Sequence, residues 1–246
     1  MTRFQLSSSQ GSRTYRRHAP VISTWWSRSP DPATPVRTSW GRSVSVVFAL
    51  AVVWKGATGT ADPRRLLIDL EIAFAGAAIW ILVSAAEWTW VTPIVLTVMT
   101  VVLLDAARIA ARPADDAAPG WLRVLARILV GIYAAWATAA VFQNWAAAIG
   151  ADLADPQSLG WQLTILIVCA LFGLAVTAVV GSVLVAYPLT LIWAFLGILA
   201  TAQGETTGIV GVAIATIVAL VVTTGVVFVS RRRGAGAVST PKPVRH

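Results

Sequence analysis

Long apolar runs separated by short polar segments dominate the pattern of this chain. Six of these runs have about 20 residues, the length that an α-helix needs to cross the hydrocarbon core of a bilayer. They cover residues 66–86, 91–111, 125–149, 161–180, 183–202 and 209–229. The pattern therefore predicts an all-α fold, a polytopic membrane helix bundle with six transmembrane helices.

A shorter apolar run, residues 44–54, precedes these six. It is too short to span a bilayer, so we expect an interfacial or re-entrant segment, and the count rises to seven only if it crosses. The chain ends are polar and rich in arginine. We expect residues 1–43 to form a disordered basic arm, residues 44–230 the bundle, and residues 231–246 a disordered basic tail.

The junction between the runs 161–180 and 183–202 is very short. Gly181 and Ser182 alone separate the two runs. Two helices joined by so short a connection must reverse direction at once. The sequence therefore predicts a tight antiparallel hairpin at this point.

Charge decides the predicted orientation. Only 12% of the residues are charged, against about 25% in soluble domains, and the formal net charge is +8. The basic residues outside the two chain ends are Lys55, Arg64, Arg65, Arg108, Arg112, Arg123 and Arg127, whereas the other connections carry Glu87, Asp152, Asp155 and Glu205. Six spans put all the basic segments on one side, so the positive-inside rule predicts a cell-membrane protein with both termini cytoplasmic. The bilayer, and not nucleic acid, is the partner that this charge pattern indicates.

Catalytic motifs are absent from the sequence. The two histidines, His18 and His246, lie in the chain ends, and no phosphate-binding loop, nucleophile elbow or zinc-protease motif is found. The single cysteine, Cys169, lies in an apolar run and is typical of a small packing residue. Asp69, Glu71 and Asp105 remain as candidates for catalysis, but charges near helix ends are usually structural. We expect no enzymatic activity, no metal site and no obligatory cofactor.

Tryptophan is unusually abundant, with 12 residues in the chain. In the six-helix topology four of them lie near the non-cytoplasmic surface, where aromatic belts form. These are Trp88, Trp90, Trp145 and Trp161. Trp80, Trp136 and Trp193 lie within apolar spans, which an interfacial belt does not explain.

The run 125–149 carries two different stripes. Tyr133, Trp136, Ala140 and Asn144 share one helix face at intervals of three and four residues. A neighbouring face repeats small residues at intervals of four, which lets another helix approach closely. These small residues are Gly131, Ala135 and Ala139, and a similar ridge in the next run comprises Cys169, Gly173, Thr177 and Gly181. The aromatic stripe is either ordinary interhelical packing, with Asn144 hydrogen-bonded across the bundle, or one wall of a ligand site.

Three segments resemble the tryptophan-rich sensory protein family, the bacterial relatives of the translocator protein (peripheral benzodiazepine receptor), particularly its long actinobacterial-type branch. GIYAAWATAAVFQNWAAAI, residues 131–149, resembles the family's G-x-Y-x-x-W helix. AFAGAAIWILV, residues 73–83, resembles the helix with a central tryptophan, and AYPLTLIWAFLGI, residues 186–198, a late helix of the family. The family's first full-length helix has no counterpart in the N-terminal quarter.

The resemblance implies a membrane sensory protein that binds a flat hydrophobic molecule, such as a porphyrin or haem, within the bundle, often as a homodimer. The residues that it places in the ligand site are Trp80, Tyr133, Trp136, Asn144 and Trp193. Aromatic faces suit a flat apolar ligand, and a few polar groups orient it. The alternatives are a small transporter or transporter subunit, with a polar break around Gln203 to Gly208, and a scaffold without a ligand.

Overall fold

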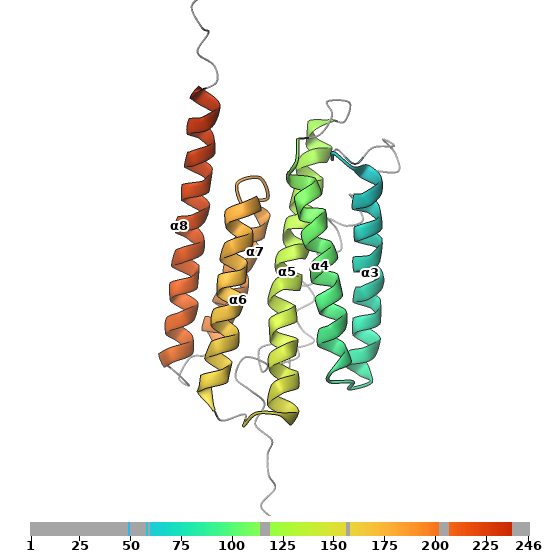
Figure 1. Cartoon of the computed structure of the whole chain (residues 1–246), viewed down its shortest axis with the longest axis vertical. Helices are drawn as coiled ribbons and strands as arrows, with labels where there is room; N and C mark the ends of the chain where they lie inside the picture. The colour runs from blue at the N-terminus through green and yellow to red at the C-terminus, as the bar shows by residue number, and fades with distance from the viewer. Residues whose placement is uncertain are drawn as a thin grey trace, which may run out of the picture.

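The computed structural model of the chain describes Ala49, Thr58 and residues 60–113, 119–155, 158–201 and 207–237. Apart from turns, these residues form helices throughout. The helices are α3 (Pro63–Ala85), α4 (Val91–Ala111), α5 (Gly120–Asp152), α6 (Leu159–Val180), α7 (Ala186–Thr201) and α8 (Thr207–Ala237) (Figure 1). The predicted all-α polytopic bundle is confirmed, and five of these helices are long and apolar enough to cross a membrane. The basic arm and the short run 44–54 lie outside the described residues, Ala49 excepted.

Helix α7, which corresponds to the fifth of the six predicted spans, is shorter than predicted. It has 16 residues and begins at Ala186, whereas the apolar pattern placed its start at residue 183. Pro188 explains the late start, because proline lacks an amide proton and is tolerated in the first turn of a helix but not farther inside it. At about 1.5 Å per residue, α7 is about 24 Å long and falls short of the roughly 30 Å hydrocarbon core.

Two other helices are longer than their apolar runs. The central helix α5 begins at Gly120 and ends at Asp152, so it includes polar turns beyond the predicted 125–149. Helix α8 continues to Ala237. The prediction of a disordered tail from residue 231 is therefore wrong for residues 231–237. Hydropathy alone ends a helix at the first charged residues, although helical hydrogen bonding continues past the membrane surface.

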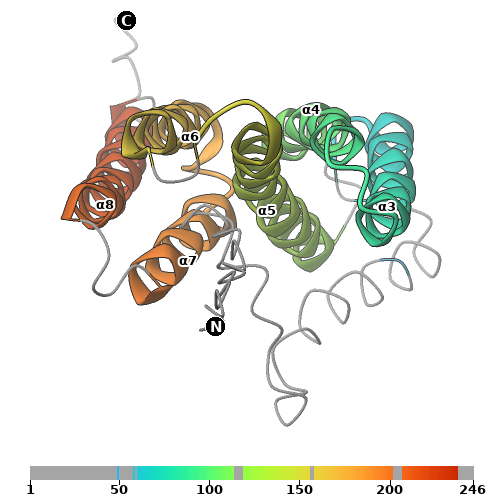
Figure 2. The ribbon, with the colours of Figure 1, turned by 90° about the horizontal axis from the view of Figure 1, so that it is seen from below.

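Helix α5 occupies the centre of the bundle and packs against α4, α6 and α7 (Figure 2). Helix α3 lies outside α4, and α8 lies outside α6 and α7. Consecutive helices α6 and α7 run antiparallel but contact each other only slightly, because α7 packs mainly against α5 and α8. The predicted short antiparallel reversal is present, but its two helices do not pack tightly against each other, because the main neighbours of α7 are α5 and α8.

Small residues set the closest helix contacts. A β-carbon at Gly131 of α5 would lie 3.0 Å from Cβ of Ala186, and one at Gly173 of α6 would lie 2.8 Å from Cδ1 of Leu191, in the middle of α7. Ala135 is completely buried. The predicted packing roles of these small residues are confirmed. Such contacts allow helices to approach each other where lipid gives no hydrophobic driving force.

Charge separates the two ends of the bundle. One end, where α3, α5 and α7 begin and α8 finishes, holds all the described lysine and arginine residues; we call it the basic end (Figure 1). These are Arg64, Arg65, Arg108, Arg112, Arg123, Arg127 and Arg231 to Arg233. The opposite, acidic end carries Glu87, Asp152 and Asp155. The predicted segregation of the basic residues is thus present in the described part of the fold, although the basic end also holds Asp62, Asp69, Glu71 and Asp105.

Candidate functional site

An aromatic cluster joins α3 and α5 within the apolar part of the bundle. Tyr133 and Trp136 lie one turn apart on α5, with ring centroids 6.2 Å from each other. Trp136 meets Trp80 of α3 edge to face at 5.7 Å, and Tyr133 meets Phe74 of α3 at 5.3 Å. We call these four residues the aromatic cluster. Tilted and edge-on contacts at these distances are the favourable arrangements of aromatic rings.

The aromatic cluster has a buried floor and an open side. Met99 of α4 and Ala140 of α5 are almost completely buried, and both Trp80 and Trp136 pack against their group. Phe74, by contrast, is 40% exposed, and the other three rings are half-buried. Gly76 explains how α4 comes so close, because a β-carbon there would collide with the side chain of Met99. The rings therefore line a surface that a molecule outside α3 and α5 can reach.

Trp80 carries an unused hydrogen-bond donor. Its indole Nε1 is buried and has no acceptor among the described residues. Buried indole N–H groups usually find a partner, and an unmet donor in an apolar region costs free energy. The N–H of Trp80 is therefore an unsatisfied donor within the described part of the bundle.

The other two predicted site residues lie apart from these rings. Asn144 is on the same face of α5, two turns beyond Trp136, and its Nδ2 donates to the Ala140 carbonyl oxygen at 2.8 Å. This bond lies within α5, and the described residues provide no hydrogen bond from Asn144 across the bundle. Trp193 lies on α7 and is 53% exposed. Helix α7 packs against the other side of α5, where Tyr187 meets Thr138.

Phe74 is the member of the aromatic cluster that the sequence analysis missed. It lies in the segment 73–83 that carried the family resemblance, but its contact with Tyr133 depends on how α3 and α5 cross. The small residues Gly76 and Ala77 beside it are a usable signal, since they mark a face where a neighbouring helix comes close. Nothing local in the sequence selects Phe74 over the other apolar residues of α3.

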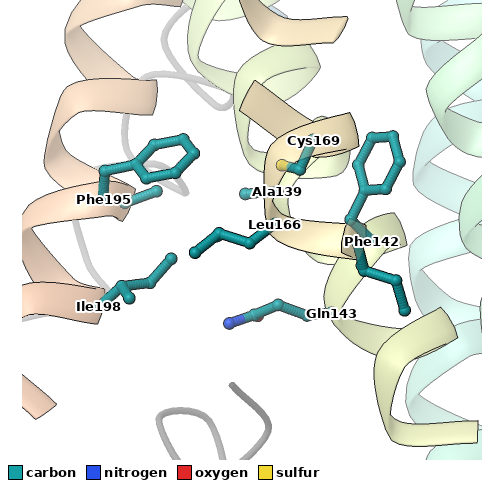
Figure 3. A pocket seen from close by; sticks show the side chains of 9 residues that line it. Ala139, Phe142, Gln143, Leu166, Cys169, Phe195 and Ile198 are labelled. Atoms are coloured by element: carbon teal, nitrogen blue, oxygen red, sulfur yellow. The ribbon is translucent and has the colours of Figure 1, made fainter. Parts of the chain in front are cut away.

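A small cavity lies elsewhere, between α5, α6 and α7 (Figure 3). Its volume is about 20 Å³, enough for about one water molecule. Apolar side chains such as Phe142 and Phe195 line it together with Cys169 and the single amide Gln143. A cavity of this size is far below the roughly 300 to 1,000 Å³ of small-molecule sites, so in this conformation it does not admit a large ligand.

The four tryptophans predicted for an aromatic belt lie toward the acidic end. Nε1 of Trp90 donates to Oδ2 of Asp152 at 2.7 Å, and the rings of Trp90 and Trp145 are 6.2 Å apart. Nε1 of Trp161 donates to the Asp155 carbonyl oxygen at 3.0 Å, while Trp88 is 59% exposed in the α3–α4 turn. Half-exposed indoles with polar partners are typical of a membrane–water interface.

The long apolar helices, the charge segregation and the four tryptophans near the acidic end define a multi-pass helical membrane protein. The chain matches the family described as TSPO-like protein over residues 41–227, which is most of its length. The chain belongs to this family, as the resemblance to tryptophan-rich sensory and translocator proteins predicted. The branch within the family stays a prediction. Comparison with curated proteins and with solved structures gives no significant match.

Proposed function

We propose that this TSPO-like membrane protein binds a flat hydrophobic molecule, such as a tetrapyrrole, against the aromatic cluster of α3 and α5. The carrying observation is that Trp136 contacts both Trp80 of α3 and Tyr133 of α5, three residues that the sequence predicts for a ligand site. A flat apolar ring system gains both burial and stacking from such a surface. Sensing follows if the bound ligand changes the stability of the bundle or its contacts.

The place of the ligand follows from the space that the described residues leave. The cavity between α5, α6 and α7 is too small for a tetrapyrrole, whereas the aromatic cluster is partly exposed along α3. We therefore place the ligand against the outer side of α3 and α5, with its plane on the exposed parts of Phe74 and Tyr133.

Asn144 and Trp193 have weaker support as ligand contacts. Asn144 shares the face of Trp136 but lies two turns away, where it can meet only the far edge of a large ligand. Trp193 belongs to a helix on the other side of α5 and reaches the same ligand only if the ligand extends around the bundle. The core of the proposed site is accordingly Phe74, Trp80, Tyr133 and Trp136.

Titration of a porphyrin into the purified full-length protein tests the proposal. Soret absorbance and tryptophan quenching should show saturable binding to the wild type. Trp136→Ala should weaken binding by about 0.5 to 1.5 kcal/mol beyond the effect of the lost apolar area, because it removes the central ring. Trp161→Ala is the matched control, since it removes a tryptophan near the acidic end. Thermal unfolding of both variants confirms that they are folded.

Two results would contradict the proposal. Absence of saturable binding to the wild type favours a scaffold without this ligand. Equal affinities of the wild type and both variants leave binding somewhere else on the protein and make the aromatic cluster a packing feature.

A further inference from the structure

One face of α5 carries arginine where it leaves the helix bundle. Arg123, Arg127 and Gly131 are spaced by four residues and so lie along one face of the helix. Gly131 contacts Ala186, the first residue of α7. Arg127 lies one turn and Arg123 two turns nearer the basic end. The face of α5 that meets the first residue of α7 at Gly131 therefore continues as an arginine face toward the basic end.

The arginine face of α5 lies beyond the start of α7, within reach of the charge of Arg231 on α8. Figure 1 shows that the α6–α7 turn stops below the upper ends of both α5 and α8. Helix α8 brings Arg231 to this level, and the positive charges of Arg123 and Arg231 both act on Arg127. We call these three residues the arginine cluster. They come from two helices that are distant in the sequence.

The charges of the arginine cluster are not balanced by acidic side chains within the described residues. No carboxylate is among the groups that act on Arg127, and the one ion pair found there joins Arg65 to Asp105. Arg127 directs its Nε to the Ala110 carbonyl oxygen of α4 at 3.1 Å, which leaves its other donors available. Like charges held together in this way repel one another unless an anion lies between them.

Arg123 provides an independent sign of a missing anion. Its Nε is buried and has no hydrogen-bond acceptor among the described residues. The hydroxyl oxygen of Ser182, in the α6–α7 turn, is likewise buried and without a partner. A guanidinium donor withdrawn from water is costly unless it meets an acceptor, and a charged acceptor satisfies it best.

We propose that the arginine cluster binds the phosphate group of an anionic phospholipid at the basic end of the bundle. The planar guanidinium forks of Arg123 and Arg127 match the oxygen geometry of a phosphate, and Arg231 adds charge from α8. Phosphates of an anionic leaflet lie at this level of a membrane protein, so the lipid arrives without entering the hydrocarbon core. This site is separate from the aromatic cluster and does not depend on the proposed ligand.

Native mass spectrometry of the full-length protein with added lipid tests this proposal. Phosphatidylglycerol should remain bound to the wild type in preference to phosphatidylcholine. Arg123→Gln and Arg231→Gln should each weaken phosphatidylglycerol binding by about threefold to tenfold, the effect expected from the loss of one partly exposed charged hydrogen bond. Arg112→Gln is the matched control, because it removes one charge from the same end but lies at the end of α4, outside the arginine cluster.

The control variants distinguish a specific lipid-binding site from non-specific electrostatic attraction between the basic end and anionic lipid. Equal losses in Arg123→Gln and Arg112→Gln would show a diffuse charge effect and overturn the proposal, as would equal binding of the two lipids by the wild type. In a separate competition experiment, inorganic phosphate is added to the lipid-bound protein, and chloride at the same ionic strength serves as the control. If phosphate displaces the lipid at equal concentration, the site takes a free phosphate and the lipid assignment is wrong. Arg231→Gln changes an exposed residue of α8, so it stays informative if Arg123→Gln does not fold.

Discussion

The hydroxyl oxygens of Tyr187 on α7 and Thr138 on α5 lie 3.2 Å apart, and both residues are completely buried. Thr138 also directs its hydroxyl to the Ala134 carbonyl oxygen at 2.8 Å. Threonine has one hydroxyl proton, so Tyr187 is the donor in the contact with Thr138. This bond fixes the short helix α7 against the central helix of the bundle.

We predict that Tyr187→Phe lowers the free energy of unfolding by about 1 kcal/mol, because it removes one buried hydrogen bond and little volume. The measurement is thermal unfolding in detergent. Thr138→Val should have a similar effect, and the double variant should lose clearly less than the sum of the two. Strict additivity would mean that the two hydroxyls do not interact.

Enlargement of Ala135 should destabilise the bundle. The residue is completely buried on the small-residue face of α5, so Ala135→Leu should cost about 1 to 3 kcal/mol through overpacking. Ala215→Leu, on the exposed side of α8, is the control with the same added volume. Equal melting temperatures of the two variants would argue against close helix packing at Ala135.

Asp69 and Asp105 should respond differently to neutralisation. Asp69 is 8% exposed as a residue, its carboxyl interacts with that of Asp105, and its Oδ2 has no hydrogen-bond partner among the residues described. Asp105 pairs with Nε of Arg65 at 2.7 Å. Asp69→Asn should raise thermal stability because it removes a poorly compensated buried charge. Asp105→Asn should lower it slightly, by less than about 1 kcal/mol, since Arg65 is largely exposed. A fall in melting temperature for Asp69→Asn contradicts this account.

The charge segregation predicts the orientation in the membrane. The C-terminal end of α8, the end of α4 and the start of α5 lie at the basic end, so all three should face the cytoplasm. Reporter fusions at His246 and in the connection 152–156 should report opposite sides of the membrane. Reports from the same side would refute the number of crossings between these two points.

Local features of the fold were predictable from the sequence, and relations between helices were less so. The limits of α4 and the close packing of Gly131 follow from apolar runs and four-residue spacing, which are properties of one helix. Pro188 carried a readable signal for the late start of α7. No signal in the sequence identifies α5 and α8 as the neighbours of α7, because every helix in an apolar bundle offers a similar surface.

The residues of the candidate site likewise fall into those that were predictable from a single helix and those that depend on contacts between helices. Tyr133 and Trp136 were recognisable because one helix turn places them together, and Trp80 because it lies deep in a span. Phe74 was not, since its contact depends on the crossing of α3 and α5. The arginine cluster was recognised only as interfacial charge, because Arg123 and Arg231 are more than 100 residues apart in the sequence.

The limited length of α7 also has a consequence for the surrounding bilayer. Five helices match or exceed the usual hydrocarbon thickness, but α7 does not, so the hydrophobic surface of the protein is uneven around its circumference. Lipids beside α7 must compress, or their headgroups must sink toward the turn between α6 and α7. Such hydrophobic mismatch favours thinner membranes and makes the lipid shell itself asymmetric, with its thinnest part beside the shortest helix.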